Sequence, residues 1–327
     1  MRILVTGGLG FIGWEVAQQA IAAGHRVVLV DDCSAHVVSL DQARAAGAGV
    51  RPVPVQHADK VNDQHTLRVD AVIHCASPVG AAGVIGRDCV TEITEATAAA
   101  IRIARAADCP LINVSTSEVY GQDGTNTEAD PLVIPPRYSS RLGYAVGKLA
   151  GEHQVAHAAA RGLRAVSVRP FNVVGPLQAP GKGFVLPRFC EQAWAGEMPT
   201  VFGSGRQARA LLHVADAARF LLLLLDRPQV LDGRAINVGA EDNTVTVERL
   251  ALAVQSAVHR AGGPAPRPIA LVDGRDVFGD GWEEAAAGTK LPDPTLAHRI
   301  GWRPRMDLWG IVSESVEHHR PAAREAA

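Results

Sequence analysis

Thr6-Gly7-Gly8-Leu9-Gly10-Phe11-Ile12-Gly13 determines how the first half of this chain folds. The segment follows a short apolar run from Arg2 to Thr6 and opens a stretch with helical character. Glycines at 7, 10 and 13 permit a tight turn, a close approach of the backbone to a pyrophosphate, and close packing of helix on strand. The start of that helix offers N–H groups and the positive end of its dipole to phosphates. We therefore predict a dinucleotide-binding loop, with a purely structural turn as the alternative.

A carboxylate at the end of the next predicted strand indicates which dinucleotide binds. Asp31 lies 18 residues after Gly13, where a carboxylate accepts hydrogen bonds from a ribose 2′-hydroxyl. The same charge would repel a 2′-phosphate, and Asp32 and the two residues after it supply no arginine. We predict NAD rather than NADP as the cofactor. Asp59, just after the third predicted strand, either bonds the adenine amino group or caps the next helix.

Beyond this loop, short β-branched runs alternate with alanine-rich stretches of helical length, the pattern of repeated βαβ units. The predicted strands are Arg2–Thr6, Arg26–Val30, Val50–Val55, Ala71–Cys75, Leu111–Ser115 and Arg164–Val168. Their near-continuous apolar content indicates a parallel sheet covered on both faces. The predicted fold class is α/β, a doubly wound Rossmann sheet with helices on both faces and a smaller C-terminal α/β substrate-binding lobe.

The rhythm changes after Gly175, where prolines and glycines punctuate the chain. We assign residues 1–172 to an NAD-binding domain, to which residues 211–240 return. Residues 173–210 and 241–327 then form the smaller lobe.

Composition excludes several classes of partner. The 327 residues are 47% hydrophobic and 20% charged, and a formal charge of -2 gives no electrostatic case for nucleic acid or an anionic membrane. The longest aliphatic run, Leu221 to Leu225, is too short to span a bilayer. Five cysteines without C-x-x-C spacing suggest neither disulfides nor a thiolate metal site, so we expect a reducing cytoplasm. His153 and His157 miss the H-E-x-x-H pattern, and no metal is predicted.

Tyr144 and Lys148 form the pattern Y-x-x-x-K, which places both side chains on one face of a helix. A free tyrosine with a pKa of about 10 is only about 0.1% ionised at neutral pH. A neighbouring ammonium and an oxidised nicotinamide lower that pKa, so that the tyrosine serves as the base for an alcohol. The alternative is an exposed aromatic side chain beside a solvated lysine.

Ser115-Thr116-Ser117-Glu118-Val119-Tyr120-Gly121 ends the fifth predicted strand, on the side of a parallel sheet where ligands bind. If the strand geometry continues, Thr116 and Glu118 point to one side and Ser115 and Ser117 to the other. Thr116 would then hydrogen-bond the hydroxyl being oxidised, and Glu118 would serve a second proton transfer.

The chain resembles the extended short-chain dehydrogenase/reductase family, the NAD-dependent nucleotide-sugar epimerases and dehydratases, over nearly its whole length. The matching segments are residues 6–13, 70–74, 115–121, 144–148, 169–176, 183–189, 201–205 with Arg209, and 213–216. The resemblance implies NAD, a nucleotide-sugar substrate with a UDP-sugar favoured, and a homodimer built on helices around 88–107 and 144–161.

The resemblance also implies roles for individual residues. The implied catalytic residues are Thr116, Tyr144 and Lys148, with Glu118. The implied cofactor-binding residues are Gly7, Gly10, Phe11, Ile12, Gly13, Asp31, Asp32, Asp59, Cys75, Ala76, Ser115, Tyr144, Lys148 and Pro170. The implied substrate-binding residues are Ser117, Asn172, Arg188 and Arg209. An arginine suits a diphosphate because its planar fork binds two oxygens, although Arg209 as a surface ion-pair residue is the alternative. Asp216 is expected to cap the following helix.

The family shares oxidation of a sugar carbon, usually C4, and its members differ in the fate of the resulting ketone. We narrowly favour 4-epimerisation. Close alternatives are UDP-glucuronate decarboxylation and 4,6-dehydration, because Thr116-Ser117-Glu118 resembles the pattern of those enzymes, and Ser77-Pro78 and Gly147 resemble the decarboxylases. The segment 78–87 departs from the family, with glycines at 80, 83 and 86 in place of substrate-contacting residues. A regulatory NAD sensor without chemistry is the non-enzyme alternative, which the presence of both Tyr144 and Lys148 disfavours.

Overall fold

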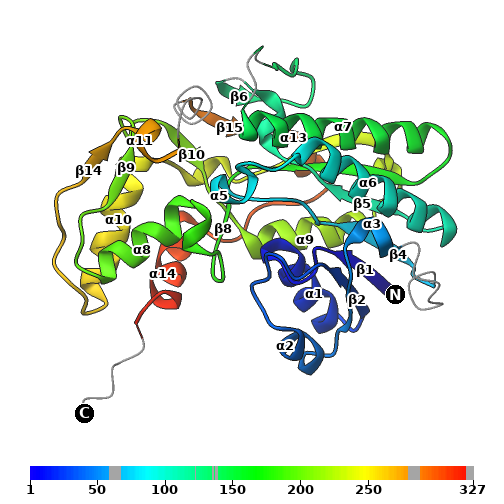
Figure 1. Ribbon diagram of the computed structural model, residues 1–327, viewed down its shortest axis with the longest axis horizontal. Coiled ribbons are helices and arrows are strands. Elements are labelled where there is room, and N and C mark those ends of the chain that lie inside the picture. The colour runs from blue at the N-terminus through cyan, green and yellow to red at the C-terminus, as the bar shows by residue number, and fades with distance from the viewer. Residues whose placement is uncertain (59–67, 122, 135, 137–138, 279–287, 322–327) are drawn as a thin grey trace.

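A seven-stranded parallel sheet crosses the molecule (Figure 1). The computed structural model describes residues 1–58, 68–121, 123–134, 136, 139–278 and 288–321. The strands in spatial order are β12 (Asp232–Val238), β7 (Ala165–Pro170), β5 (Leu111–Val114), β4 (Ala71–His74), β1 (Arg2–Thr6), β2 (Arg26–Asp31) and β3 (Gly49–Pro52). The chain runs outward from β1 to β3, then crosses back to β4 and continues the other way. The change of direction between β1 and β4 opens a crevice at the carboxyl ends of these strands, where such sheets bind ligands.

Helices cover both faces of this sheet because its strands are apolar on both sides. Ile3 and Val5 face one hydrophobic cluster and Leu4 faces another, as alternation along a strand requires. In Figure 1, α1 and α9 cover one face, and α6 and α7 lie side by side across the other. Ordered by sequence, the helices are α1 (Phe11–Ala22), α2 (Leu40–Ala45), α3 (Val55–Ala58), α5 (Ala81–Val84), α6 (Cys89–Ala106), α7 (Ser140–Ala160), α8 (Val185–Trp194), α9 (Val214–Leu224), α10 (Val247–Arg260), α11 (Gly274–Phe278), α13 (Thr295–Arg299) and α14 (Leu308–His318).

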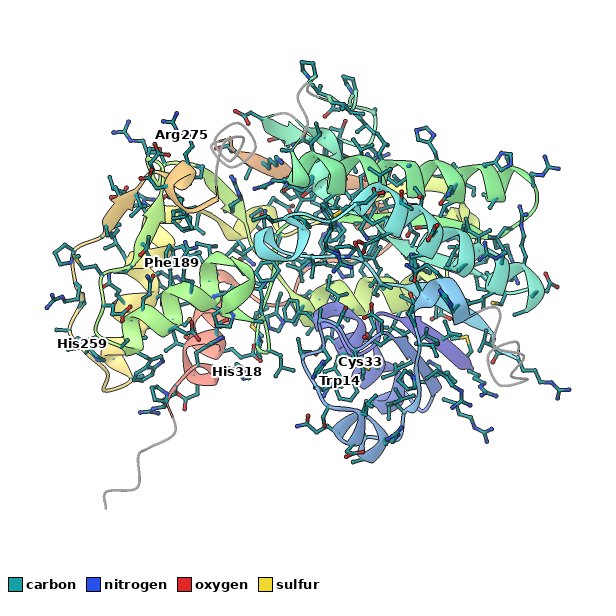
Figure 2. The ribbon with its side chains drawn as sticks, in the orientation of Figure 1. Trp14, Cys33, Phe189, His259, Arg275 and His318 are labelled. Carbon is teal, nitrogen blue, oxygen red and sulfur yellow. The ribbon has the colours of Figure 1, made fainter. Side chains whose placement is uncertain are left out.

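A smaller lobe gathers around α8, α10 and α14, beside the carboxyl ends of the strands (Figure 1). It has its own hydrophobic cluster, to which Phe189 of α8 belongs, whereas Trp14 of α1 belongs to the cluster under the main sheet (Figure 2). Short strands complete it and its junction with the main sheet. They are the sheet β13 (Thr244–Thr246), β10 (Ala208–Ala210), β15 (Lys290–Pro292) and β6 (Gly124–Asn126), and the pairs β11 (Leu212–His213) with β8 (Val173–Val174) and β14 (Ala270–Val272) with β9 (Thr200–Phe202). Single 3-10 turns are η1 (Ser117–Tyr120), η2 (Pro180–Lys182), η3 (Pro228–Val230) and η4 (Glu241–Asn243).

The predicted α/β class is confirmed, with three local corrections. The third strand ends at Pro52, and Val55 begins α3 instead of ending the strand. A seventh strand, β12, extends the sheet beyond the six predicted. Asp216 does not cap α9, because that helix begins at Val214 and the side chain of His213 accepts the capping N–H. Asp216 instead accepts the main-chain N–H groups of Arg305 and Met306, each at 2.9 Å.

Candidate active site

A cavity of about 1360 Å³ lies at the carboxyl ends of the main strands, bounded by the smaller lobe. It is larger than the roughly 300–1,000 Å³ of an ordinary small-molecule pocket and suits a cofactor together with a substrate. Every described residue that the sequence assigned to a site lines this cavity. They are Gly7, Gly10, Phe11, Ile12, Gly13, Asp31, Asp32, Cys75, Ala76, Ser115, Thr116, Ser117, Glu118, Tyr144, Lys148, Pro170, Asn172, Arg188 and Arg209. Asp59 lies outside the described residues.

The glycine loop has the close approaches for which it was predicted. Gly7 has φ +63°, and a Cβ there would lie 2.7 Å from the backbone of Ala76. A Cβ on Gly13 would lie 2.1 Å from the carbonyl oxygen of Gly7. Gly10 precedes α1, and the first residues of that helix line the cavity while no side chain caps its N-terminus. This cradle of small residues and N–H donors fits a pyrophosphate.

Asp31 holds the loop while it faces the cavity. Its carboxylate accepts the N–H groups of Leu9 at 2.9 Å and Cys33 at 2.8 Å. Burial raises the pKa of Asp31, against the lowering effect of those two N–H groups. Asp32 accepts both the N–H and the hydroxyl of Ser34, which turns the chain away from the end of β2. Two acidic side chains at this end fit a ribose with free hydroxyl groups.

Helix α7 carries the predicted pair. It begins at Ser140, where the side chain of Ser139 accepts the N–H of Leu142. Gly147 and Gly151 let it lie close on α6, since a Cβ on Gly147 would be 2.8 Å from the carbonyl oxygen of Cys89. The close packing of α7 on α6 determines where Tyr144 and Lys148 enter the cavity.

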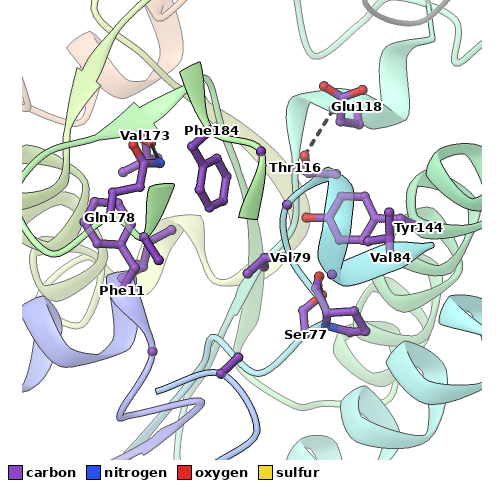
Figure 3. Close-up of a pocket in the computed structure, with 18 of the residues that line it drawn as sticks. Phe11, Ser77, Val79, Val84, Thr116, Glu118, Tyr144, Val173, Gln178 and Phe184 are labelled. Atoms are coloured by element: carbon purple, nitrogen blue, oxygen red, sulfur yellow. Dashed lines mark hydrogen bonds between the residues drawn. The ribbon is translucent and has the colours of Figure 1, made fainter. Parts of the chain in front are cut away.

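Tyr144 faces Thr116 across the cavity wall (Figure 3). Burial raises the pKa of Tyr144 to about 12, and a hydrogen bond with Thr116 acts in the opposite direction. The Lys148 ammonium lies 5.9 Å from the centre of the Tyr144 ring and donates to the carbonyl oxygen of Val114 at 2.7 Å. Burial lowers the pKa of Lys148 to about 8, so the side chain is largely an ammonium ion at neutral pH. An alcohol can bind between the Thr116 hydroxyl and the Tyr144 phenol, with the positive charge of Lys148 near the phenol ring.

The segment after β5 does not continue as a strand, so the predicted alternation of Ser115 to Glu118 is wrong. β5 ends at Val114, and residues 117–120 form the turn η1. The Thr116 hydroxyl accepts the N–H of Glu118 at 3.2 Å and so caps this turn (Figure 3). Threonine competes effectively for a nearby N–H, which ends the strand here.

Glu118 belongs to an ion cluster that sequence reasoning missed. Arg141 binds its carboxylate through two nitrogens, each at 3.0 Å, and the Lys290 ammonium lies 2.9 Å away. Burial alone would raise the pKa of Glu118, but the two cations lower it to about 2. Arg141 stands three residues before Tyr144 on the same helix, a spacing that could have been noticed, whereas Lys290 is distant in sequence.

The other half of the cavity is lined from the smaller lobe. Arg188 of α8 lies with its guanidinium carbon 4.3 Å from the centre of the Phe202 ring, and burial lowers its pKa to about 10. Arg209 of β10 donates to the carbonyl oxygens of Ala208 and Gly288. Asn172, with φ 40°, donates to the carbonyl oxygen of Ala210 at 3.2 Å. Two cations and an aromatic ring suit a nucleoside diphosphate.

The described ranges also bear on two further features, a cluster of metal-ligating side chains and a membrane-spanning helix. No group of three or more His, Cys, Asp or Glu side chains there is placed to hold a metal ion. No helix within those ranges has both the length and the apolar character needed to cross a membrane. His74 is a buried histidine whose ring lies 2.6 Å from the Thr6 hydroxyl, and burial lowers its pKa to about 3.

Comparison with known proteins agrees with this geometry. Residues 3–239 match the model of the NAD dependent epimerase/dehydratase family. The UDP-N-acetyl-alpha-D-glucosaminuronate decarboxylase of Bacillus cytotoxicus is 29% identical, with 98% of each chain covered. The dTDP-glucose 4,6-dehydratase of Streptomyces niveus is 30% identical, covering 98% of this chain and 93% of its own. The structure of UDP-glucuronic acid 4-epimerase from Bacillus cereus in complex with NAD superposes with a TM-score of 0.76 at 22% identity, covering 98% of both chains.

Proposed function

The chain belongs to the NAD dependent epimerase/dehydratase family, and from that premise we propose that it decarboxylates a nucleotide-linked uronic acid after transient oxidation at C4. It is an enzyme, and its cofactor is NAD. Decarboxylases, dehydratases and epimerases all occur among its relatives and structural neighbours. The geometry and charges of the site must therefore indicate which of these reactions this chain catalyses.

The first step rests on Thr116, Tyr144 and Lys148. Thr116 accepts or donates a hydrogen bond at the C4 hydroxyl, and Tyr144 removes the proton of that hydroxyl. The positive charge of Lys148, 5.9 Å from the centre of the Tyr144 ring, favours the phenolate and acts against the burial that raises the pKa of Tyr144. Bound NAD supplies the acceptor for the hydride that leaves C4.

The observation that carries the proposal is the ion cluster at Glu118. A 4,6-dehydration needs an acidic residue that removes the C5 proton and can give a proton to the departing hydroxyl. With its pKa lowered to about 2 by Arg141 and Lys290, Glu118 is ionised at neutral pH and is a weak base. Dehydration through Glu118 is therefore disfavoured.

Decarboxylation requires no proton from Glu118. Oxidation at C4 turns a uronic acid into a β-keto acid, in which the C5–C6 bond breaks, carbon dioxide leaves, and its electron pair becomes an enolate spanning C5 and the C4 oxygen. A proton then adds at C5, the hydride would return to C4, and Tyr144 gives its proton back to the C4 oxygen, so that no net oxidation remains. The ionised Glu118 offsets part of the positive charge of Arg141 and Lys290, which would otherwise hold the substrate carboxylate more tightly and slow its loss as neutral carbon dioxide. Similarity to a decarboxylase over the full chain length supports this reading.

A second candidate is 4-epimerisation, which the sequence favoured narrowly. An epimerase needs only Tyr144, Thr116 and Lys148, together with room for the keto sugar to turn over. The volume of the cavity, about 1360 Å³, supports this alternative.

Product mass distinguishes the candidates. The purified protein is incubated with UDP-glucuronate, UDP-N-acetylglucosaminuronate, UDP-glucose and dTDP-glucose, and the products are analysed by mass spectrometry. We expect one uronate to give a product lighter by carbon dioxide, and a Tyr144→Phe variant to give none. A product of unchanged mass assigns epimerisation, and loss of water returns the assignment to dehydration.

We propose a UDP-sugar as substrate and a homodimer as the assembly. The relative from Bacillus cytotoxicus acts on a UDP-sugar by its name, which supports the nucleotide. Helices α6 and α7 lie side by side on one face, where the family resemblance predicts the dimer contact (Figure 1). Competition by UDP against dTDP tests the nucleotide, and light scattering in solution tests the dimer.

A further inference from the structure

A buried ion pair lies beneath the catalytic residues and has no part in the chemistry above. Glu152 of α7 and Arg169 of β7 are only 7% and 5% exposed. Arg169 donates to both carboxylate oxygens of Glu152, through Nη2 at 2.7 Å and through Nε at 3.0 Å. Neither residue lines the cavity.

Such a pair is poorly explained by stability alone. Two charges lose their hydration on burial, and apolar residues of similar volume often serve stability as well or better. The contacts that Glu152 and Arg169 make with other elements therefore indicate what the pair does.

Glu152 and Arg169 both form hydrogen bonds with the segment that carries Thr116 and Glu118. Ser115, which directly precedes Thr116, donates a hydrogen bond from its hydroxyl to the Glu152 carboxylate. At the other end, Arg169 donates to the Tyr120 hydroxyl at 3.0 Å, and its guanidinium carbon lies 4.9 Å from the centre of the Tyr120 ring. The Tyr120 hydroxyl in turn donates to Asn237 of β12 at 2.7 Å. The segment 115–120 is thus fixed at both ends to one ion pair.

The same pair acts on Lys148. Glu152 lies one helical turn after Lys148 on α7, on the same face. Other groups around this ammonium are the Val114 carbonyl of β5, His74 of β4, Cys75 just after β4, and the Tyr144 ring. Burial lowers the pKa of Lys148, and this lowering is opposed by Glu152 and, once its thiol ionises, by Cys75. A thiol whose pKa burial raises to about 12 carries no charge at neutral pH, so Glu152 supplies the opposing charge there.

We propose that Glu152 and Arg169 are positioning residues that hold the segment 115–120 in place and keep Lys148 charged. The inference rests on the proposed roles of Thr116, Tyr144 and Lys148 and assigns no contact with substrate. On this proposal the ion pair acts on the reaction by positioning the catalytic groups, and its role is not limited to stabilising the fold.

The direct test is the titration of Lys148 in the Glu152→Gln variant of the full chain. The sequence has four lysines, at 60, 148, 182 and 290, so isotope-labelled lysine gives an NMR signal for each, and Lys148→Arg identifies the signal of Lys148. Glu152→Gln removes a negative charge near Lys148 and leaves the positive charge of Arg169 without its carboxylate partner. Both effects lower the pKa of Lys148. Turnover of the sugar falls by roughly 100-fold, the scale of a small misplacement of catalytic groups.

Two further variants separate positioning from general stability. Asp216→Asn removes a comparable ion pair with Arg219, outside the residues that line the cavity, and should leave the Lys148 titration unchanged. If Glu152→Gln does not fold, the double variant Glu152→Gln/Arg169→Gln leaves no uncompensated charge and should fold with turnover still reduced. Unchanged Lys148 titration and unchanged turnover in a folded variant would overturn the inference. The titration needs no substrate, so it remains informative if no nucleotide sugar is consumed by the unaltered protein, an outcome that would reject the proposed function instead.

Discussion

Lys148 donates a hydrogen bond to the carbonyl oxygen of Val114 at 2.7 Å, which ties helix α7 to the last residue of strand β5. Because Thr116 lies two residues after Val114, this bond fixes the distance between the helix that carries Tyr144 and the turn that carries Thr116. This bond therefore links the predicted catalytic pair on α7 to the segment that carries the Thr116 hydroxyl. Substitutions on either side of this contact should affect chemistry more than cofactor binding.

Replacement of Tyr144 by phenylalanine tests this separation. Tyr144→Phe removes the proton acceptor but keeps the ring that packs against Val84 and Ile93. We expect turnover to fall by roughly 100-fold or more, as general acid–base contributions require, with bound NAD retained. Single-turnover reduction of NAD, followed by absorbance, measures the first step. Loss of NAD together with activity would show instead that the ring has a structural role.

Because of the ion cluster at Glu118, the free energy of unfolding depends on pH in the acid range. The folded pKa of Glu118, about 2, lies below its ordinary value. The contribution to stability is therefore fully present above the ordinary carboxyl pKa and is lost as pH falls from about 5 toward 2. Its size is on the order of 1–3 kcal/mol, since the side chain is 23% exposed and solvent screens part of the interaction. Denaturant unfolding at pH 6 and pH 3 measures it, and Glu118→Gln should flatten the difference between those two values.

Local patterns were enough to predict that residues of the glycine loop, the end of β2 and α7 come together at one cavity. The glycine spacing at 7, 10 and 13, the acidic end of β2 and the i, i+4 pair on α7 each lie within a short segment, so their geometry depends on one strand, one turn or one helix. The sheet order then brings them to one edge, because parallel strands end on the same side. The structure places Gly7, Asp31, Tyr144 and Lys148 on a common cavity.

The reacting half could not be predicted in the same way. Lys290 reaches Glu118 across 172 positions of sequence, through the pairing of β15 with β10 and β6, and no local pattern announces that contact. The alternation expected for Ser115 to Glu118 failed because the Thr116 hydroxyl captures the N–H of Glu118 and begins a turn. Side-chain competition for a backbone donor outweighed the strand tendency of the segment.

The glycine loop offers a test of the cofactor site that needs no substrate. Gly13→Ala would place a Cβ 2.1 Å from the carbonyl oxygen of Gly7, so the strand and helix must separate. We expect a loss of about 3 kcal/mol or more in stability and loss of NAD binding. Gly24→Ala is the matched control, because its Cβ meets no atom within 4 Å, and its φ of +81° costs about 1–2 kcal/mol without any contact to the cofactor site. Calorimetric NAD titration and thermal unfolding compare the two, and equal NAD affinity in both variants would contradict the predicted contact.

Glu118→Gln should change the fate of the keto sugar as well as its rate of formation. The substitution removes the carboxylate charge that offsets Arg141 and Lys290, so the net charge of the cluster rises from about +1 to about +2 and a bound uronate carboxylate is stabilised. We expect carbon dioxide release to fall by roughly 10- to 100-fold, the effect of about 1.4 to 2.7 kcal/mol on the barrier. The C4 ketone then survives long enough for the hydride to return to either face, so a product of unchanged mass should accumulate. Mass spectrometry gives the ratio of the lighter product to the unchanged mass, and proton NMR of the sugar identifies the C4 epimer. Glu317→Gln, the same change at an exposed glutamate of α14 that does not line the cavity, serves as the control for purification and cofactor content. An unaltered product ratio would mean that the charge of Glu118 does not drive decarboxylation, and a faster release of carbon dioxide would reverse the sign of the electrostatic argument.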